Sequence, residues 1–266
     1  MWTCSKRQGS NEPAAARILV KVLATYSIKG GVGKTTSAVN LAREAAISGG
    51  RVLVWDLDPQ GAATFFFRIR PKVKGGTERL VSSKGDLVEH VRASDIPGVH
   101  VIPADFSLRH LDLHLDGSKR PTERLASLLT GVKGRYDVAF LDCPPSISLA
   151  SESVFGAADA LLVPVIPTTL SSRTLHQLSE FLETQDSPPA LLPYFSMVDG
   201  RKNLHRNVMA ALREEWPHLL PTSVPNASVI ERMGPEQAPV GSYAPSSLAA
   251  EAFASLWNDV AARLWA

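Results

Sequence analysis

The chain contains a glycine-rich loop, Lys29-Gly30-Gly31-Val32-Gly33-Lys34-Thr35-Thr36, between two segments of different periodicity. The stretch from Ile18 to Tyr26 is apolar and rich in β-branched residues, which predicts a buried strand. From Lys34 to Ser48 small and apolar residues recur at helical spacing, until Gly49 and Gly50 end the helix. The loop is therefore expected to join the end of a strand to the start of a helix.

A loop in this position turns several backbone N–H groups toward one point, where the helix dipole adds partial positive charge. Phosphate is the natural ligand of such a loop. Gly30, Gly31 and Gly33 permit close approach of the backbone. Lys34 can reach the β and γ phosphates of ATP, and the Thr35 hydroxyl can ligate Mg²⁺. A turn that only joins strand to helix is the alternative, but the register of glycine, lysine and threonine favours a nucleotide site.

Apolar runs of strand length recur along the rest of the chain, and helix-length segments separate most of them. These runs are Arg51–Asp56, Val99–Ile102, Val138–Leu141, Ala160–Pro164, Leu191–Val198 and Leu219–Val224. The alternation predicts an α/β fold, a doubly wound and mostly parallel twisted sheet with helices on both faces, as in P-loop NTPases. We expect one domain over residues 17–266, preceded by a flexible polar tail over residues 1–16.

Composition limits the classes of protein that remain. The chain has 266 residues, of which 44% are hydrophobic and 20% charged, so it can bury a full core. Its formal net charge of +2 does not by itself indicate nucleic-acid binding. Cys4 and Cys143 form neither a disulfide framework nor a metal-ligand cluster, and no apolar run reaches bilayer length. We expect a cytoplasmic protein without a membrane partner.

Acidic residues follow two of the predicted strands. Phosphoryl transfer needs charge neutralisation and a positioned water, so carboxylates are expected at strand ends near the loop. Asp56 and Asp58 follow the second strand, and side-chain alternation puts them on one side if the strand continues. Asp142 ends an apolar strand, which is the Walker B form, and would hold magnesium. Each aspartate alone is more often a turn or capping residue; together with the loop they indicate a site.

The loop departs from the general phosphate-loop pattern, which expects glycine where this chain has Ile28 and then Lys29. Here the sequence resembles the deviant Walker A ATPases, the ParA/MinD family, whose hallmark is KGGVGKT followed by serine or threonine. The resemblance implies that Lys29 reaches across an ATP-dependent homodimer to the partner's phosphates, and that it belongs with Lys34 and Asp58 to the catalytic group. A solvated loop lysine is the alternative.

The same resemblance assigns roles to further residues. Asp56 to Gly61 matches the family's DxDPQG segment, so Asp58 is the candidate that orients the attacking water and lies near magnesium, while Asp56 supports the loop lysine or the magnesium shell. Two C-terminal stretches resemble LTMxDxRTNL and IPRNxxxxEAP. They place four residues near the adenine of ATP: Met197, Asp199, Pro225 and Asn226.

ParA proteins bind DNA without sequence preference, and four cations of this chain are the candidates for that contact. They are Arg201, Lys202, Arg206 and Arg232. Such groups could neutralise phosphates and release counterions. Glu231 and Glu236 dilute the patch, so a solvated basic face is nearly as good an interpretation.

Three functions compete. The first is a short ParA-type ATPase that binds nucleoid DNA as an ATP-dependent dimer and positions a plasmid, chromosome region or protein cargo, with hydrolysis stimulated by a ParB-like or cargo-adaptor protein. The second is a MinD-like ATPase on a membrane. The predicted last helix, Ser246 to Leu264, has an apolar stripe but only Arg263 as a terminal cation, which favours core packing. The third is a redox relative of the nitrogenase iron protein, for which Cys4 and Cys143 are poorly placed.

Overall fold

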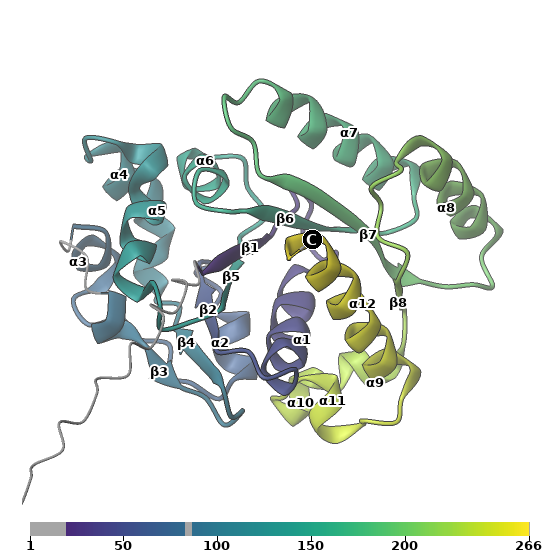
Figure 1. Cartoon of the computed structure of the whole chain (residues 1–266), viewed down its shortest axis with the longest axis horizontal. Coiled ribbons are helices and arrows are strands. Elements are labelled where there is room, and N and C mark those ends of the chain that lie inside the picture. The colour runs from purple at the N-terminus through teal and green to yellow at the C-terminus, as the bar shows by residue number, and fades with distance from the viewer. Residues whose placement is uncertain (1–19, 83–86, 266) are drawn as a thin grey trace, which may run out of the picture.

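The computed structural model describes residues 20–82 and 87–265 and contains an eight-stranded sheet in the order β3-β4-β2-β5-β1-β6-β7-β8 (Figure 1). All described neighbouring strands pair in parallel except β3 and β4. The strands are β1 Lys21–Thr25, β2 Val52–Asp56, β3 Arg92–Ala93, β4 Val99–Ile102, β5 Val138–Asp142, β6 Ala160–Val165, β7 Ala190–Val198 and β8 Ser223–Pro225.

Helices cover both faces of this sheet. The α-helices are α1 Lys34–Ile47, α2 Ala62–Phe66, α3 Gly76–Ser82, α4 Leu111–Asp116, α5 Arg124–Leu129, α6 Leu149–Phe155, α7 Thr169–Glu183, α8 Asn203–Glu215, α9 Ser228–Glu231, α10 Met233–Glu236, α11 Val240–Tyr243 and α12 Leu248–Leu264. Short 3₁₀ helices are η1 Leu87–His90, η2 Phe106–His110, η3 Pro121–Glu123 and η4 Thr130–Val132. Figure 1 shows α1 beside α12 on one side of the sheet and α7 on the other.

The central strands are buried on both faces because their alternate side chains enter two different cores. Along β2, Val52 and Val54 pack in the core that contains α1 and α12, whereas Leu53 and Trp55 pack in the core on the opposite face. The runs are apolar without interruption because both faces of these strands are buried, and the predicted doubly wound α/β fold is confirmed.

Two details of the prediction were wrong. The run Leu219–Val224 was expected to be a strand, but only Ser223–Pro225 pairs with β7. Leu219 and Leu220 are buried, and the Leu220 N–H donates to the Pro193 carbonyl of β7 at 2.8 Å, but Pro221 has no N–H to continue the pairing. The antiparallel edge strand Arg92–Ala93 was not predicted, because two exposed residues carry no periodic signal.

Three further predictions concern the last helix, the first strand and the N-terminal tail. The apolar stripe of the last helix is core, since Phe253, Leu256 and Trp257 are buried on α12. The predicted first strand is observed from Lys21 to Thr25, and its start at Ile18 lies outside the described residues. The expected tail over residues 1–16 also lies outside them, so the proposed domain boundaries stay a prediction.

Strand register brings the expected site together. Thr25 of β1 and Asp56 of β2 each pair with Asp142 of the central strand β5. These three residues end their strands at the same edge of the sheet, and the glycine loop leaves β1 at that edge. Segments more than a hundred residues apart in sequence thus meet at the carboxyl ends of parallel strands.

Candidate nucleotide-binding site

The glycine loop ends in an uncapped helix. Gly33 is the N-cap of α1 with a φ of 98°, and no side chain caps the first turn. The first backbone N–H groups of a helix lack intrahelical partners, so those of Lys34, Thr35 and Thr36 are available to a ligand. The three residues line a cavity of about 260 Å³. Its other lining residues are Gly30, Gly31, Gly33, Asp58, Pro145 and Met197.

Strand β7 holds the loop from behind. The Ser196 hydroxyl donates to the Val32 carbonyl at 2.9 Å, and the Ser37 hydroxyl donates to the Gly33 carbonyl at 2.9 Å while also hydrogen-bonding the Tyr194 hydroxyl. A Cβ atom at Gly33 would lie 3.0 Å from Ser196 Oγ. Glycine suits this position for two reasons: the backbone has a positive φ, and the Ser196 side chain leaves little room for a Cβ atom. Sequence reasoning missed these supports because they join residues far apart in the chain.

Lys34 is a buried cation with unused hydrogen-bonding capacity. It is 7% exposed, and its Nζ donates to the Lys29 carbonyl at 3.2 Å. Burial lowers the pKa of Lys34 below its ordinary value, while the nearby Asp142 carboxylate opposes that shift. An ammonium group has three donors, so a bound phosphate would satisfy the others and offset the cost of burial.

Asp142 is the most unusual group of the site. It is fully buried; Oδ1 accepts a hydrogen bond from the Thr25 hydroxyl at 3.2 Å, and Oδ2 has no hydrogen-bond partner within the described part of the chain. Burial, followed by the charge of Asp56, raises the pKa of Asp142 to about 8, while the neighbouring Thr35 hydroxyl lowers it. A divalent cation or its water would satisfy the orphaned oxygen and favour the ionised carboxylate.

These groups fit a magnesium ion that keeps most of its ligands from water and phosphate. Residues 20–82 and 87–265 hold no cluster of three or more His, Cys, Asp or Glu side chains arranged for a metal. Mg²⁺ is commonly bound by one or two protein oxygens together with substrate phosphates. Thr35 and Asp142 supply a hydroxyl and a carboxylate on either side of such a position, so a protein-only cage is not required.

Asp56 and Asp58 have different surroundings. Both oxygens of the buried Asp56 are occupied, Oδ2 by the Thr64 N–H and hydroxyl at 2.8 and 2.7 Å and Oδ1 by the Asp58 N–H at 3.2 Å. Burial raises the pKa of Asp56 to about 6. Among the described contacts it makes no hydrogen bond or ion pair with Lys34, and it fixes the start of α2 through Thr64. Its predicted support of the loop lysine or the magnesium shell stays a prediction. The half-buried Asp58 lines the phosphate cavity.

Lys29 stands apart from the other loop residues. Its backbone N–H donates to the Ser27 hydroxyl at 3.2 Å and its carbonyl accepts from Lys34. Its ammonium has no hydrogen bond or ion pair to any residue that the structure describes, and Lys29 does not line the phosphate cavity. The prediction that it acts on a second copy's phosphates stays a prediction.

A second, more apolar cavity of about 150 Å³ adjoins the first and shares Gly33, Thr36 and Met197 with it. Met197, Pro225 and Asn226 line it as expected for residues near a base. Sequence reasoning missed the apolar wall from Val224, Ile230 and Phe253, because Phe253 comes from the distant α12. Met197 has a φ of 53°, a left-handed conformation that costs energy in a residue with a side chain.

Asp199 lies outside both cavities. Arg201 donates to its two oxygens at 2.9 and 3.0 Å, and this interaction lowers the pKa of Asp199 to about 2. In the structure the carboxylate holds Arg201 and does not line the cavity of Met197, Pro225 and Asn226, and the position of Asp199 near the adenine stays a prediction. The sequence around Asp199 and Arg201 carries no signal that distinguishes a residue near the adenine from one that pairs with an arginine.

The basic residues predicted to contact DNA are partly neutralised. Arg201 pairs with Asp199, and Arg232 pairs with Glu236 at 2.6 Å. Arg206 donates to the Gly200 carbonyl at 2.7 Å and to Asn203, and Lys202 is exposed. Their contact with DNA stays a prediction.

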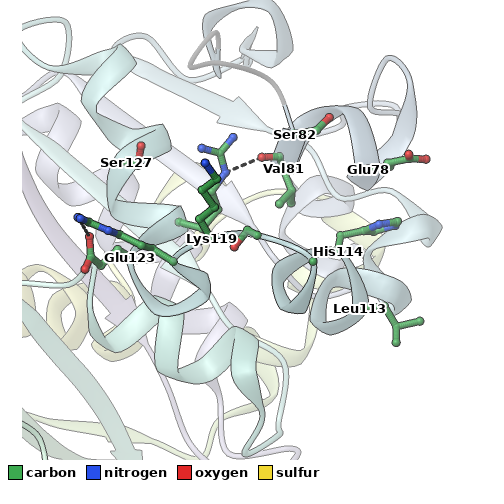
Figure 2. Close-up of a pocket in the computed structure, with 12 residues that line it drawn as sticks. Glu78, Val81, Ser82, Leu113, His114, Lys119, Glu123 and Ser127 are labelled. Carbon is green, nitrogen blue, oxygen red and sulfur yellow. Dashed lines mark hydrogen bonds and ion pairs between the residues drawn. The ribbon is translucent and has the colours of Figure 1, made fainter.

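A larger cavity lies elsewhere. It has a volume of about 650 Å³ and lies between α3, α4 and α5, and Figure 2 shows residues that line it. It brings together Glu78, His114, Lys119 and Glu123, a mixture of charges. Arg124 spans one wall and donates to the Val81 carbonyl at 2.5 Å. Size alone does not make it the nucleotide site, because its lining lacks convergent phosphate-binding groups.

Known proteins share this chain's sequence and fold. The sequence profile of the family described as "AAA domain" matches residues 20–188. The sporulation initiation inhibitor protein Soj of Bacillus subtilis is 30% identical over 251 residues, covering 91% of this chain and 98% of Soj. The chromosome partitioning protein ParA of Caulobacter vibrioides is 34% identical over 172 residues, covering 62% of each chain. Cobyrinic acid a,c-diamide synthase of Mycobacterium smegmatis, solved with a bound ATP analog and magnesium, superposes with a TM-score of 0.78 at 25% identity, covering 93% of this chain and 96% of that one.

The chain belongs to this AAA domain family and, within it, to the ParA/MinD group of P-loop ATPases. The resemblance inferred from Lys29–Thr36 is thereby confirmed. Throughout the described helices, none is both long and apolar enough to cross a membrane.

Proposed function

We propose that this chain is a Mg²⁺-dependent ParA-type ATPase that forms an ATP-sandwich homodimer, binds DNA without sequence preference and positions a plasmid, chromosome region or protein cargo. A ParB-like or cargo-adaptor protein would stimulate hydrolysis and so release the dimer from the nucleoid. The name of the ParA relative, a chromosome partitioning protein, supports the partitioning role.

One observation supports the ATPase part most strongly. Two kinds of polar group with unused hydrogen-bonding capacity line one cavity, the uncapped N–H groups of α1 and the buried ammonium of Lys34, and the orphaned Oδ2 of Asp142 lies buried beside Lys34 and Thr35. Each is costly in the absence of a ligand. A triphosphate with a divalent cation supplies the complementary charges at once, whereas a neutral ligand would leave the ammonium and the carboxylate unsatisfied.

The residues of this chain divide the chemistry between them. Lys34 and the α1 amides would hold the phosphates and stabilise charge that develops on the transferred group. Asp142 and Thr35 would hold Mg²⁺, which, when bound, neutralises phosphate charge. Asp58 would accept a hydrogen bond from the attacking water and orient it in line with the γ phosphate. Phosphoryl transfer needs little more than such positioning.

Dimerisation would complete the site. The free ammonium of Lys29 lies on the loop but does not line its own cavity. A lysine from a second copy, placed beside the γ phosphate, would act as an arginine finger does, by stabilising transition-state charge. The site of one chain would then be competent to bind ATP and incompetent to hydrolyse it quickly.

The test separates the parts of this proposal. The purified chain is incubated with ATP and Mg²⁺, with ADP and Mg²⁺, or without nucleotide, and each sample is examined by size-exclusion chromatography with light scattering, by retention on immobilised duplex DNA and by sedimentation with anionic vesicles. We expect dimers and DNA retention with ATP only. Retention on vesicles but not on DNA would replace this proposal with the MinD-like one, and absence of phosphate release would remove the ATPase assignment.

A further inference from the structure

A basic segment lies between α2 and α3, outside every group of residues considered so far. From Ala62 to Thr77 the chain contains Arg68, Arg70, Lys72 and Lys74 and no acidic residue. The overall charge of +2 conceals this segment, because acidic residues elsewhere balance it. Residues 69–73 have no regular secondary structure, so their orientation depends on what they pack against.

Two apolar side chains anchor the segment to the protein. Ile69 is partly buried against the core on one side of the sheet, and Val73 is buried in the core on the other. Arg70, Lys72 and Lys74 are exposed between and beyond these two anchors, as is Pro71. The three cations, here called the row, therefore face solvent within five consecutive residues.

Backbone hydrogen bonds fix the row in place. The Ile69 N–H donates to the Thr64 carbonyl at 3.0 Å, and the Val73 N–H donates to Asp105 Oδ2 at 3.1 Å. The Gly76 N–H then donates to the Val73 carbonyl at 3.0 Å. The segment is therefore held at both ends, and Lys72 lies near the Asp105 carboxylate without an ion pair to it within the described residues.

The three cations keep their charge available. Arg68 pairs with Asp95 at 3.4 Å, but Arg70, Lys72 and Lys74 make no ion pair or side-chain hydrogen bond within the described residues. The basic residues first predicted to bind DNA differ in this respect, since Arg201 and Arg232 are both paired with carboxylates. Figure 1 shows α3 toward the left and α8 at the right, so the segment lies apart from the cations at the start of α8. Arg232 is closer to the segment, because Arg68 donates to the carbonyl of its partner Glu236 at 2.9 Å.

We propose that Arg70, Lys72 and Lys74 form a surface that binds the phosphate backbone of duplex DNA without sequence preference. This inference rests on the proposed function, to which it adds the site of contact. Exposed cations held on a fixed backbone neutralise phosphates and release counterions, which is the main source of sequence-independent affinity. The row also adjoins the loop that carries Asp58, because a Cβ atom at Gly61 would lie 4.0 Å from the Cβ of Pro71.

DNA suits this surface better than a lipid bilayer does. A peripheral membrane segment needs an apolar face to bury among the acyl chains, usually on an amphipathic helix. Here Ile69 and Val73 face the protein, and the exposed apolar side chains beside the segment are two separate phenylalanines, Phe65 of α2 and Phe106 next to Asp105, rather than the apolar face of an amphipathic helix. What remains toward solvent is charge, which requires only an accessible row of phosphates.

The experiment compares the native chain with the triple variant Arg70→Gln, Lys72→Gln, Lys74→Gln. Affinity for a fluorescent duplex of arbitrary sequence is measured by anisotropy with ATP and Mg²⁺ across a salt series. We expect affinity to fall at least about 10-fold and the slope of log K against log salt to become shallower by about 2 to 3, since each lost phosphate contact removes roughly 0.9. ATP turnover without DNA should not change.

Two further variants control for structure and for net charge. Arg70→Lys, Lys72→Arg, Lys74→Arg keeps the row charged and should bind as the native chain does. Lys119→Gln, Lys133→Gln, Arg135→Gln removes the same charge from exposed sites elsewhere and should lower affinity much less.

Four results would overturn the proposal: native affinity in the Gln row variant, equal loss in the charge-keeping variant, equal loss in the distant variant, or ATP-dependent binding of the native chain to anionic vesicles alone. If the native chain retains DNA while the row variant does so equally, only this inference fails. If the native chain retains no DNA, the DNA-binding part of the proposed function fails with it.

Discussion

The floor and the rim of the phosphate cavity are built in different ways. The floor consists of three buried residues: Lys34, which lines the cavity, and Thr25 and Asp142, which end strands β1 and β5, hydrogen-bond each other and lie beside Lys34. The rim consists of Lys29 and Asp58, which are partly exposed and lie on connections that follow strands. The floor presents its unsatisfied groups to a ligand, whereas the Lys29 ammonium of the rim has no described partner and does not reach the cavity of its own chain.

This difference separates binding from turnover. A floor that one chain completes by itself should bind nucleotide in a monomer. A rim that one chain leaves open should limit hydrolysis until a second copy arrives. Variants of the floor are therefore expected to abolish affinity, and variants of the rim to slow turnover at nearly unchanged affinity.

The largest effect is expected in the floor, for Lys34→Ala. Removal of the buried ammonium takes away a charge-assisted contact to phosphate, so affinity for ATP with Mg²⁺ should fall by about 100-fold or more. Isothermal titration calorimetry measures it, with Lys133→Ala as a control for the loss of an exposed lysine. Native affinity in the Lys34 variant would show that the floor does not bind the phosphates.

The next effect concerns the rim. Asp58→Ala should leave ATP affinity within a few-fold of native and slow phosphate release by about 100-fold, a typical loss for a group that acts only in the transition state. ATP should then trap the dimer, which light scattering detects. A parallel loss of affinity and turnover would place Asp58 in the floor and remove the distinction.

A smaller effect should come from a support of the rim. The buried Tyr26 hydroxyl donates to the Ser146 carbonyl at 2.7 Å, and burial raises the pKa of Tyr26 to about 12, so the phenol keeps its proton. This bond anchors the connection that contains Pro145, a lining residue of the cavity. Tyr26→Phe should cost about 1 kcal/mol of stability and slow turnover a few-fold without changing affinity.

Tyr243→Phe is the matched control for that variant. Its hydroxyl donates to the Val229 carbonyl at 2.6 Å, so the same kind of bond is lost in a part of the chain away from the rim. Thermal unfolding of this variant should show a similar destabilisation. Its phosphate release should not be slower than that of the native chain. Equal turnover in both variants would mean that the Tyr26 bond is only structural.

The smallest effect tests a region outside both floor and rim. His176 of α7 lies 2.5 Å from Glu215 of α8 through Nε2 and 2.8 Å from the Ser172 carbonyl through Nδ1, and these partners raise the pKa of His176. A raised folded pKa stabilises the fold below the ordinary histidine pKa, and this contribution is lost as pH rises through the folded value. His176→Gln should therefore lower the melting temperature slightly at pH 6 and not at pH 9, with turnover unchanged. An equal effect at both pH values would contradict protonation of this pair.

Local signals in the sequence predicted Lys34 and Asp142 as site residues, but not Thr25. The loop from Lys29 to Thr36 and the apolar strand before Asp142 each carry their signal within a few residues, and parallel pairing then brings them to one edge. Contacts between distant segments had no such signal. The clamp of Ser196 and Tyr194 on the loop, the base-cavity wall from Phe253 and the pairing of Asp199 with Arg201 all depend on tertiary packing.

The central claim, that a second chain completes the rim, is tested most directly by mixing two inactive variants. Lys29→Ala keeps Asp58, and Asp58→Ala keeps Lys29, so in a mixed dimer one of the two sites has its own Asp58 and can receive Lys29 only from the partner. Phosphate release is measured across mixing ratios, and differently tagged chains verify that mixed dimers form. The account predicts that mixing restores turnover that neither variant shows alone. Mixed dimers without activity would show that Lys29 does not act across the interface.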